Sequence, residues 1–287
     1  MKKLLLSGVA AVAIMAAVPA SAADLSARPA YKAAPIAAPV PVFSWTGCHV
    51  GVHAGWGWGK HRIKEHTVES ISSGHQIFDL SGSIDTSGAI FGGQVGCDYQ
   101  FAGTWVIGVE GSFSGTDING VGIDPGGLVN EDTGTGFPLE PTTARTIRVK
   151  TDTLSSVTAR LGFSGLLPQT LWYVKGGVAW SRDKWDFSNM FFESFNGTDN
   201  PTLIQRTSTG WTIGAGIEWA FAPNWSAFAE WDHYDFGWKV VADNIDDPGG
   251  SGFNRGILST HYTIETARVG VNYHFNFGKT TPIMARY

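Results

Sequence analysis

Charge is scarce in this chain. Only 16% of its 287 residues are Asp, Glu, Lys or Arg, well below the roughly 25% of an ordinary soluble domain. The 25 acidic residues outnumber the 20 basic ones, giving a net charge of −5, so the chain lacks the basic surface that nucleic-acid binding requires. We therefore expect no nucleic-acid partner. The composition also argues against a soluble α/β enzyme, whose helices are rich in Glu and Lys.

Long apolar runs are missing after the N-terminus. Mean hydropathy is −0.02, and the charge-free stretch 33–59 contains three prolines and five glycines, which break or weaken a helix. No later segment is therefore expected to form a transmembrane helix. If the chain enters a membrane, it has to do so as a closed β-barrel, because lipid satisfies no unpaired backbone groups. The abundance of glycine (37) and tryptophan (12) argues against both a helical bundle and disorder.

Residues 1–22 have the layout of a secretory signal peptide. Two lysines precede an apolar stretch that ends at Pro19, and the small residues up to Ala22 fit the cleavage rule. An uncleaved membrane anchor is the alternative, but the apolar stretch is short for one. Residues 23–44 are rich in Ala and Pro and favour extended backbone. We expect cleavage after Ala22 and a linker in the periplasm.

Runs of alternating polarity occupy residues 45–275. In the clearest, 209–221, one face carries apolar residues such as Trp211 and Ile213, and the other is mostly glycine with Glu218. Such alternation is the signature of a strand, and none of the 13 prolines falls in a run, as a sheet without edges requires. The pattern predicts an all-β fold, an eight-stranded antiparallel transmembrane β-barrel. The other seven runs lie at 49–58, 91–101, 105–113, 156–163, 172–180, 225–232 and 266–275.

The connections between the runs alternate in length. Short periplasmic turns alternating with long extracellular loops are typical of bacterial outer-membrane barrels, and this pattern places both chain ends in the periplasm. A soluble β-sandwich or lipocalin-like barrel is the main alternative, but its outward face would carry charge. We expect long connections at 59–87, 114–150, 182–206 and 237–259, and short ones at 102–103, 165–170 and 222–224.

Aromatic residues near both ends of the runs predict two girdles at the membrane surfaces. Near the short turns we place Trp45, Trp105, Trp172, Trp219, Trp225 and Tyr273. Near the long connections we place Trp56, Trp58, Trp180, Trp185 and Trp238.

Four segments resemble a known family: WTGCHVG at 45–51, GGQVGCDYQF at 92–101, GGVAW at 176–180 and RVGVNYHF at 268–275. They are similar to the small surface-antigen outer-membrane proteins of alpha-proteobacteria, porin-family members of the OmpA-like barrel class. The resemblance implies a barrel over 45–275 in the outer membrane. Members are described variously as structural, immunogenic, host-interacting or haemin-binding.

The chain departs from the family pattern at two places. The family opening commonly has an aromatic residue where Cys48 stands. Residues 276–287 form a tail past Phe275, so the aromatic residue read by the barrel-insertion machinery is either Phe275 or Tyr287.

Charged residues share the inward face of the predicted barrel. Five acids there face three bases, and we interpret them as a network that compensates buried charge. A gated ion path is the alternative, although a lumen filled by side chains predicts poor conduction. The predicted lumen charge network comprises Glu110, Arg160, Lys175, Glu218, Glu230 and Arg268, with Asp98 and Asp232 on the same face.

Both cysteines fall near the periplasmic rim of the first hairpin. Because the periplasm permits disulfides, we expect Cys48 and Cys97 to be joined. Two lipid-facing thiols are the alternative.

The histidines show no metal-binding spacing, and we expect no metal and no cofactor. His61, His66 and His75 fall in the first long connection beside Lys60, Arg62 and Lys64. These residues form either a solvated polar loop or a site for an anion such as haemin or a lipopolysaccharide phosphate.

No motif of a hydrolase or nucleotide-binding enzyme is present, and we expect no catalytic site. One alternative is a lipid A-modifying enzyme that uses the outward residues His261, Thr263 and Glu265, although Thr is a poor substitute for Ser. We predict an integral outer-membrane barrel that supports the envelope and presents four long extracellular loops. A narrow pore or haemin receptor is the other alternative. Expected partners are outer-membrane lipids and lipopolysaccharide, the insertion machinery, and host or extracellular ligands.

Overall fold

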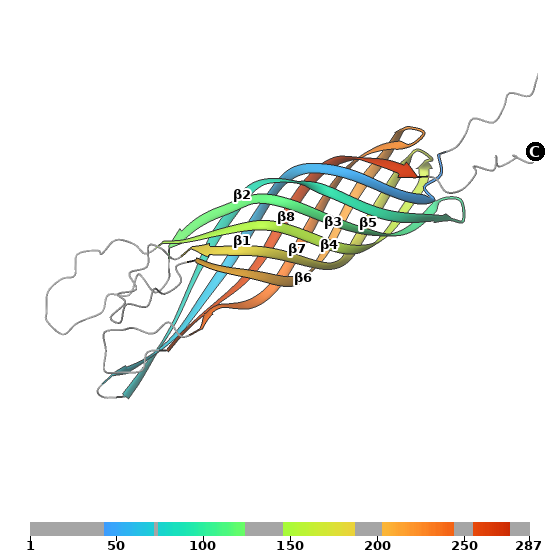
Figure 1. The fold of residues 1–287 in the computed structure, drawn as a ribbon. Helices are drawn as coiled ribbons and strands as arrows, with labels where there is room; N and C mark the ends of the chain where they lie inside the picture. Colours follow the sequence, from blue (N-terminus) through green and yellow to red (C-terminus); the bar gives the residue numbers. More distant parts are fainter. Residues whose placement is uncertain (1–42, 72–73, 124–145, 187–202, 244–254, 276–287) are drawn as a thin grey trace, which may run out of the picture. The chain divides into compact units, whose positions relative to one another are not determined.

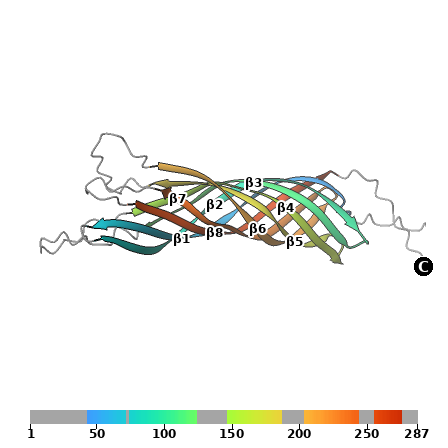
Figure 2. The same ribbon diagram turned by 90° about the horizontal axis from the view of Figure 1, so that it is seen from below.

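The computed structural model describes residues 43–71, 74–123, 146–186, 203–243 and 255–275. They form eight strands, each antiparallel to its neighbours, and β1 pairs with β8 to close a barrel (Figures 1 and 2). The predicted eight-stranded antiparallel barrel is confirmed. The strands are β1 (Gly47–Ile71), β2 (Gly74–Phe101), β3 (Trp105–Ile123), β4 (Thr146–Leu167), β5 (Thr170–Asp186), β6 (Leu203–Ala222), β7 (Trp225–Asp243) and β8 (Arg255–Phe275).

Three short turns lie at one end of the barrel, which we call the proximal end. They join β2 to β3, β4 to β5 and β6 to β7. The first strand also begins there and the last one ends there, since Cys48 pairs with Phe275. In the β2–β3 turn, Ala102 and Gly103 have φ angles of 49° and 77°, a left-handed conformation that glycine adopts without strain. Pro168 and Pro223 lie in the other two turns, where no ladder hydrogen bond is lost.

The strands run much further toward the opposite, distal end than the sequence predicted. The first hairpin pairs as far as Ile71 and Gly74, so the interpretation of 59–87 as a long connection is wrong. The other strands likewise extend into the predicted connections 114–150, 182–206 and 237–259. The remaining parts of these three connections, like the predicted signal peptide, most of the linker and the tail, lie outside the described residues.

The faces of the strands exchange polarity partway along the barrel. In β1, the outward apolar residues end at Trp58 and are followed by exposed Lys60, Arg62 and Lys64, while the inward side gains buried Ile63. A barrel wall that is polar outside and apolar inside suits water rather than lipid. On other strands the inward side likewise gains buried Ile84, Ile118 and Leu258, although some outward residues there, such as Val121 and Ile123, are exposed hydrophobics. We call this part the distal extension: 59–71, 74–88, 117–123, 146–153, 181–186, 203–209, 233–243 and 255–265.

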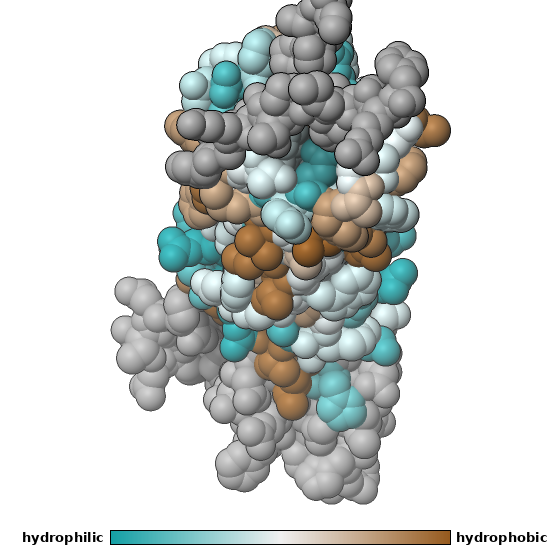
Figure 3. Space-filling model, turned by 90° about the vertical axis from the view of Figure 1, so that its right-hand side faces the viewer, coloured by the Kyte–Doolittle hydropathy of each residue, from teal (hydrophilic) through white to brown (hydrophobic). Residues whose placement is uncertain are grey.

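Below the distal extension, the outward face is a belt of exposed hydrophobic side chains. Val52, Val95 and Val269 are each 61% exposed, and hydrophobic side chains lie at the surface in Figure 3. Exposed tryptophans border this belt on both sides, as at a membrane interface. No helix of the described residues is long and apolar enough to cross a bilayer.

Two of the predicted girdle residues are not in the girdles. Trp45 and Trp185 are 1% and 2% exposed and lie inside the barrel. Side chains alternate between the two faces of a strand, and both tryptophans are an even number of residues away from inward-facing neighbours. Alternation therefore places them in the lumen, although each lies near a strand end.

Candidate functional site

The lumen holds a layer of charged residues between apolar clusters. The proximal cluster contains Trp45, Val106, Leu171, Tyr173 and Ala220, with Phe43 packed against it. Toward the distal end follow the charged residues, then an aromatic cluster around Tyr234, Phe236 and Tyr262. The outermost cluster comprises Ile63, Ile84, Ile147, Val149, Trp185, Val241 and Leu258.

Lys175 on β5 is the centre of the charged layer. Its Nζ lies 3.1 Å from Glu110 Oε1, 2.8 Å from Glu230 Oε2 and 3.5 Å from Asp232 Oδ1. Arg268 on β8 completes this half, with Nη2 2.6 Å from both Glu230 Oε1 and Asp232 Oδ2. Four strands are thus tied together across the lumen.

Arg160 on β4 organises the proximal half of the layer. Its guanidinium donates to Glu218 and lies 3.5 Å from Asp98 Oδ2 and 3.8 Å from Glu110 Oε2. The guanidinium also stacks 3.8 Å from the Tyr173 ring centroid. Glu110 contacts both Arg160 and Lys175, so the two halves form one network.

Two histidines belong to this network although the sequence analysis did not include them in it. His49 lies 3.4 Å from Asp98 and 3.6 Å from Glu110, and His274 lies 3.2 Å from Glu218. Five carboxylates face three permanent cations here, so protonation of both histidines would make the layer neutral. Both fall on the inward face of β1 and β8 by simple alternation, and this pattern could have identified them as members of the network.

Glycines make room for the buried carboxylates at two inward positions. A Cβ at Gly108 would collide with Asp98 Oδ1, and a Cβ at Gly214 would collide with Asp232 Oδ1. The glycine-rich inward face therefore follows from the crowding of an eight-stranded lumen.

The charged side chains are sealed from solvent. Glu218 is 0%, Arg268 2%, Arg160 3% and Lys175 4% exposed. A continuous water-filled path would leave these groups partly exposed. The layer, as the structure shows it, is a packed ionic core.

A second buried polar cluster lies in the distal extension. Asp183 accepts hydrogen bonds from Thr151 (2.7 Å), Ser181 (2.8 Å) and Tyr262 (2.6 Å), and burial raises the pKa of its carboxyl. The Tyr262 ring stacks on His61 at 4.9 Å. Both ring nitrogens of His61 are buried without a hydrogen-bond partner among the described residues, and burial lowers the pKa of this imidazole to about 3.

The structure therefore corrects the place of the three loop histidines. His61 is in the lumen, and His66 is exposed on β1. His75 is on β2, and its side chain lies outside the described residues. Among the described residues, no group of His, Cys, Asp and Glu has the arrangement of a metal site.

Cys48 and Cys97 are direct partners in the β1–β2 register and form a disulfide in the structure. Register was the property that spacing left open, because a shift of one residue would turn the thiols to opposite faces. The bond closes the proximal, outward rim of the first hairpin.

The three residues considered for lipid A hydrolysis are not joined to each other. His261 Nε2 lies 3.3 Å from Asp235, and Glu265 lies 2.5 Å from His233 Nδ1. No hydrogen bond between described residues connects Thr263 to His261 or Glu265.

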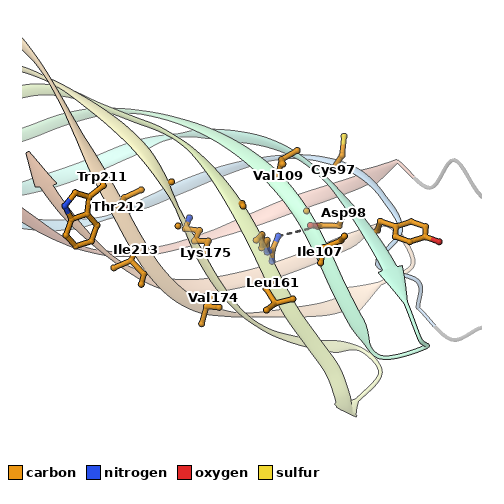
Figure 4. Close-up of a pocket in the computed structure, with 16 residues that line it drawn as sticks. Cys97, Asp98, Ile107, Val109, Leu161, Val174, Lys175, Trp211, Thr212 and Ile213 are labelled. Carbon is orange, nitrogen blue, oxygen red and sulfur yellow. Dashed lines mark hydrogen bonds and ion pairs between the residues drawn. The ribbon is translucent and has the colours of Figure 1, made fainter.

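One hollow of about 990 Å³ lies on the wall formed by β2 to β6 (Figure 4). Its outward lining includes Ile107, Val109, Leu161 and Val174, all between 45% and 61% exposed. This lining is part of the hydrophobic belt, so the hollow faces lipid.

The chain is similar to known outer-membrane proteins. The model of the outer membrane protein beta-barrel domain family matches residues 8–275. A 31 kDa outer-membrane immunogenic protein of Brucella melitensis is 30% identical over 96% of this chain and 100% of its own length. A 25 kDa outer-membrane immunogenic protein of Brucella abortus is 27% identical over 91% of this chain and 94% of its own. Among solved structures, OprG of Pseudomonas aeruginosa covers 83% of this chain and 100% of its own at 12% identity, with a TM-score of 0.43.

Proposed function

Because this chain belongs to the outer membrane protein beta-barrel domain family, we propose that it supports the bacterial outer membrane as a rigid, closed barrel and presents a surface to the exterior. The sealed ionic layer is the observation that carries this proposal. Buried ion pairs tie non-adjacent strands together across the lumen. Such cross-links make the barrel rigid, as a structural protein of the outer membrane requires.

The proposal includes an orientation. The proximal end faces the periplasm, because short turns and both ends of the strand sequence lie there. Residues 1–22 are removed as a signal peptide, 23–44 form a periplasmic linker, 45–275 the barrel and 276–287 a tail. The distal extension then begins at the headgroups of the outer leaflet, stands above the outer surface and carries the four connections of that end.

The expected partners follow from this placement. Outer-membrane lipids and lipopolysaccharide surround the hydrophobic belt, and the barrel-insertion machinery places the chain in the membrane. The loops offer a surface for host or extracellular ligands. The names of the Brucella relatives describe immunogenic outer-membrane proteins, which supports exposure at the surface.

The proposal includes neither conduction nor catalysis. A narrow pore would need a path past the buried Arg160 and Lys175, and an enzyme would need an activated nucleophile at Thr263. A haemin receptor would be a different use of the distal surface and is not part of the proposal.

Three measurements test the proposal. On intact cells, protease should cleave only within the distal connections, and the folded barrel should migrate faster than the boiled chain on a gel. In planar bilayers, the pure protein should give no large stable conductance. Cleavage at the proximal turns of intact cells would overturn the orientation, and a large stable conductance would overturn the closed lumen.

A further inference from the structure

Three cations form a row on the outward face of β1. Lys60, Arg62 and Lys64 are all exposed and are the next three outward residues after Trp56 and Trp58. We call Lys60, Arg62 and Lys64 the β1 cationic row. It begins where the hydrophobic belt ends, at the level of the headgroups of a surrounding membrane.

The neighbouring strands do not pair directly with most of this positive charge. On β2, Asp85 is in register with Lys60, but Ser83 and Ser81 are in register with Arg62 and Lys64. On β8, Thr263, His261 and Ser259 are opposite the three cations. The nearby acids Glu265 and Asp235 contact His233 and His261 and not the cations of the row. No ion pair joins the row to another described residue.

Two other outward cations of the distal extension differ in this respect. Lys150 on β4 lies 2.8 Å from Asp117, and Lys184 on β5 lies 2.7 Å from Asp152. Proximity to Asp117 raises the pKa of the Lys150 ammonium. Each of these two cations has its own carboxylate, whereas the three neighbouring cations of the β1 cationic row are available to an external anion.

Aromatic rings lie beside the row. Lys64 Nζ is 4.8 Å from the Trp238 ring centroid, and Trp238 contacts the His261 ring at 5.5 Å. Trp238 is 49% exposed on the outward face of β7. Tryptophan at this level suits the boundary between acyl chains and headgroups, so cationic and amphipathic side chains meet at one place.

The depth of the row matches a headgroup layer. Lys60 and Lys64 are four residues apart, or about 13 Å along the strand. With a strand tilt of about 40°, the row spans about 10 Å along the membrane normal. Cations at three depths can pair with phosphates at different heights in a lipid headgroup.

We propose that the β1 cationic row, with Trp238, binds the phosphate groups of an anionic lipid in the leaflet that surrounds the distal girdle. The ligand is a lipid phosphate, with the Lys and Arg side chains pairing to its oxygens and the indole of Trp238 packing on the apolar part of the headgroup. This inference rests on the proposed function, because the row must stand at a lipid surface.

Native mass spectrometry of the folded mature chain in detergent micelles tests the site, with diphosphoryl lipid A as the probe. The variant Lys60→Gln/Arg62→Gln/Lys64→Gln should bind the probe about 100-fold more weakly, or about fivefold per cation removed. The matched control Lys150→Gln/Lys184→Gln removes two paired outward cations and should change affinity less than twofold. If the triple variant fails to fold on a gel, Arg62→Gln alone should lose about fivefold.

Two further arms identify the ligand. Dephosphorylated lipid A should bind the unmodified chain as weakly as diphosphoryl lipid A binds the triple variant, and inorganic pyrophosphate should bind more weakly than the lipid. Equal binding of the triple variant and the unmodified chain, an equal loss in the control, or binding of pyrophosphate as tight as that of lipid A would overturn the inference. Folding and protease accessibility test the proposed function separately, so a failure of the lipid site would leave those readouts unchanged.

Discussion

Lys175 Nζ lies 3.1 Å from Glu110 Oε1, and this ion pair joins β5 to β3 across the intervening β4. Both residues are almost fully buried. Water cannot replace either partner, so the network has to be satisfied internally. The stability of the barrel should therefore depend on each member of the layer.

Replacement of Lys175 by Met tests this dependence. The variant leaves Glu110, Glu230 and Asp232 with less compensation, and we expect a loss of about 3–5 kcal/mol. The measurement is the urea concentration at which the folded band disappears on a semi-native gel. Lys184→Met is the matched control: its ion pair with Asp152 is partly exposed, so it should cost no more than about 1 kcal/mol. An equal loss of stability in both variants would show that the charged layer stabilises the barrel no more than a surface ion pair does.

The disulfide gives a second prediction. Alkylation of the denatured mature chain without reductant should leave its mass unchanged, because Cys48 and Cys97 are bonded to each other. After reduction, two alkyl groups should be added. Replacement of both cysteines by Ser should lower stability by about 2–4 kcal/mol, since the crosslink restricts the unfolded chain. Two alkyl groups without reductant would contradict the bond.

The membrane part of the barrel could be predicted from the sequence because one physical rule governs every strand there. Lipid requires apolar side chains outward and the crowded lumen requires small or paired polar ones inward. The inward placement of Arg160 and Glu218 followed from parity alone. Which carboxylate pairs with which cation did not, since this depends on distances across the lumen that alternation does not encode.

The sequence did not predict the distal extension because side chains still alternate there, but the polar ones face outward and the apolar ones face inward. A search for apolar residues outward stops at Trp58, although Ile63 already alternates inward. Lys60 to Lys64 were accordingly interpreted as part of a loop. Trp45 and Trp185 were misplaced for a related reason: proximity to a strand end was given more weight than parity.

Trp45 provides a third prediction, on closure of the proximal end. Its backbone N–H donates to Gln100 Oε1 (2.9 Å) and its indole donates to the carbonyl of Pro168 (3.2 Å). Trp45→Ala would remove a fully buried ring and should cost about 3–5 kcal/mol. Trp105→Ala is the matched control, because Trp105 is 43% exposed on the outward face of the same end and should cost less. The measurement is the thermal unfolding midpoint of each variant in micelles. A larger drop for Trp45→Ala than for Trp105→Ala would show that Trp45 packs inside the barrel and is not a girdle residue.

His61 gives a prediction about pH. Burial lowers the pKa of this imidazole to about 3, whereas an unfolded histidine titrates near 6.5. The unfolded chain therefore binds more protons between these values, and the His61 contribution to stability falls as the pH drops below about 6.5. His61→Phe retains a ring against Tyr262 and cannot be protonated, so it should be favoured over the unmodified chain increasingly from pH 7 to pH 4. The neighbouring Asp183 is present in both proteins, so its own titration largely cancels in the comparison. Urea midpoints of the two proteins across this range give the measurement, and a difference that stays constant with pH would show that His61 is not buried as a neutral ring.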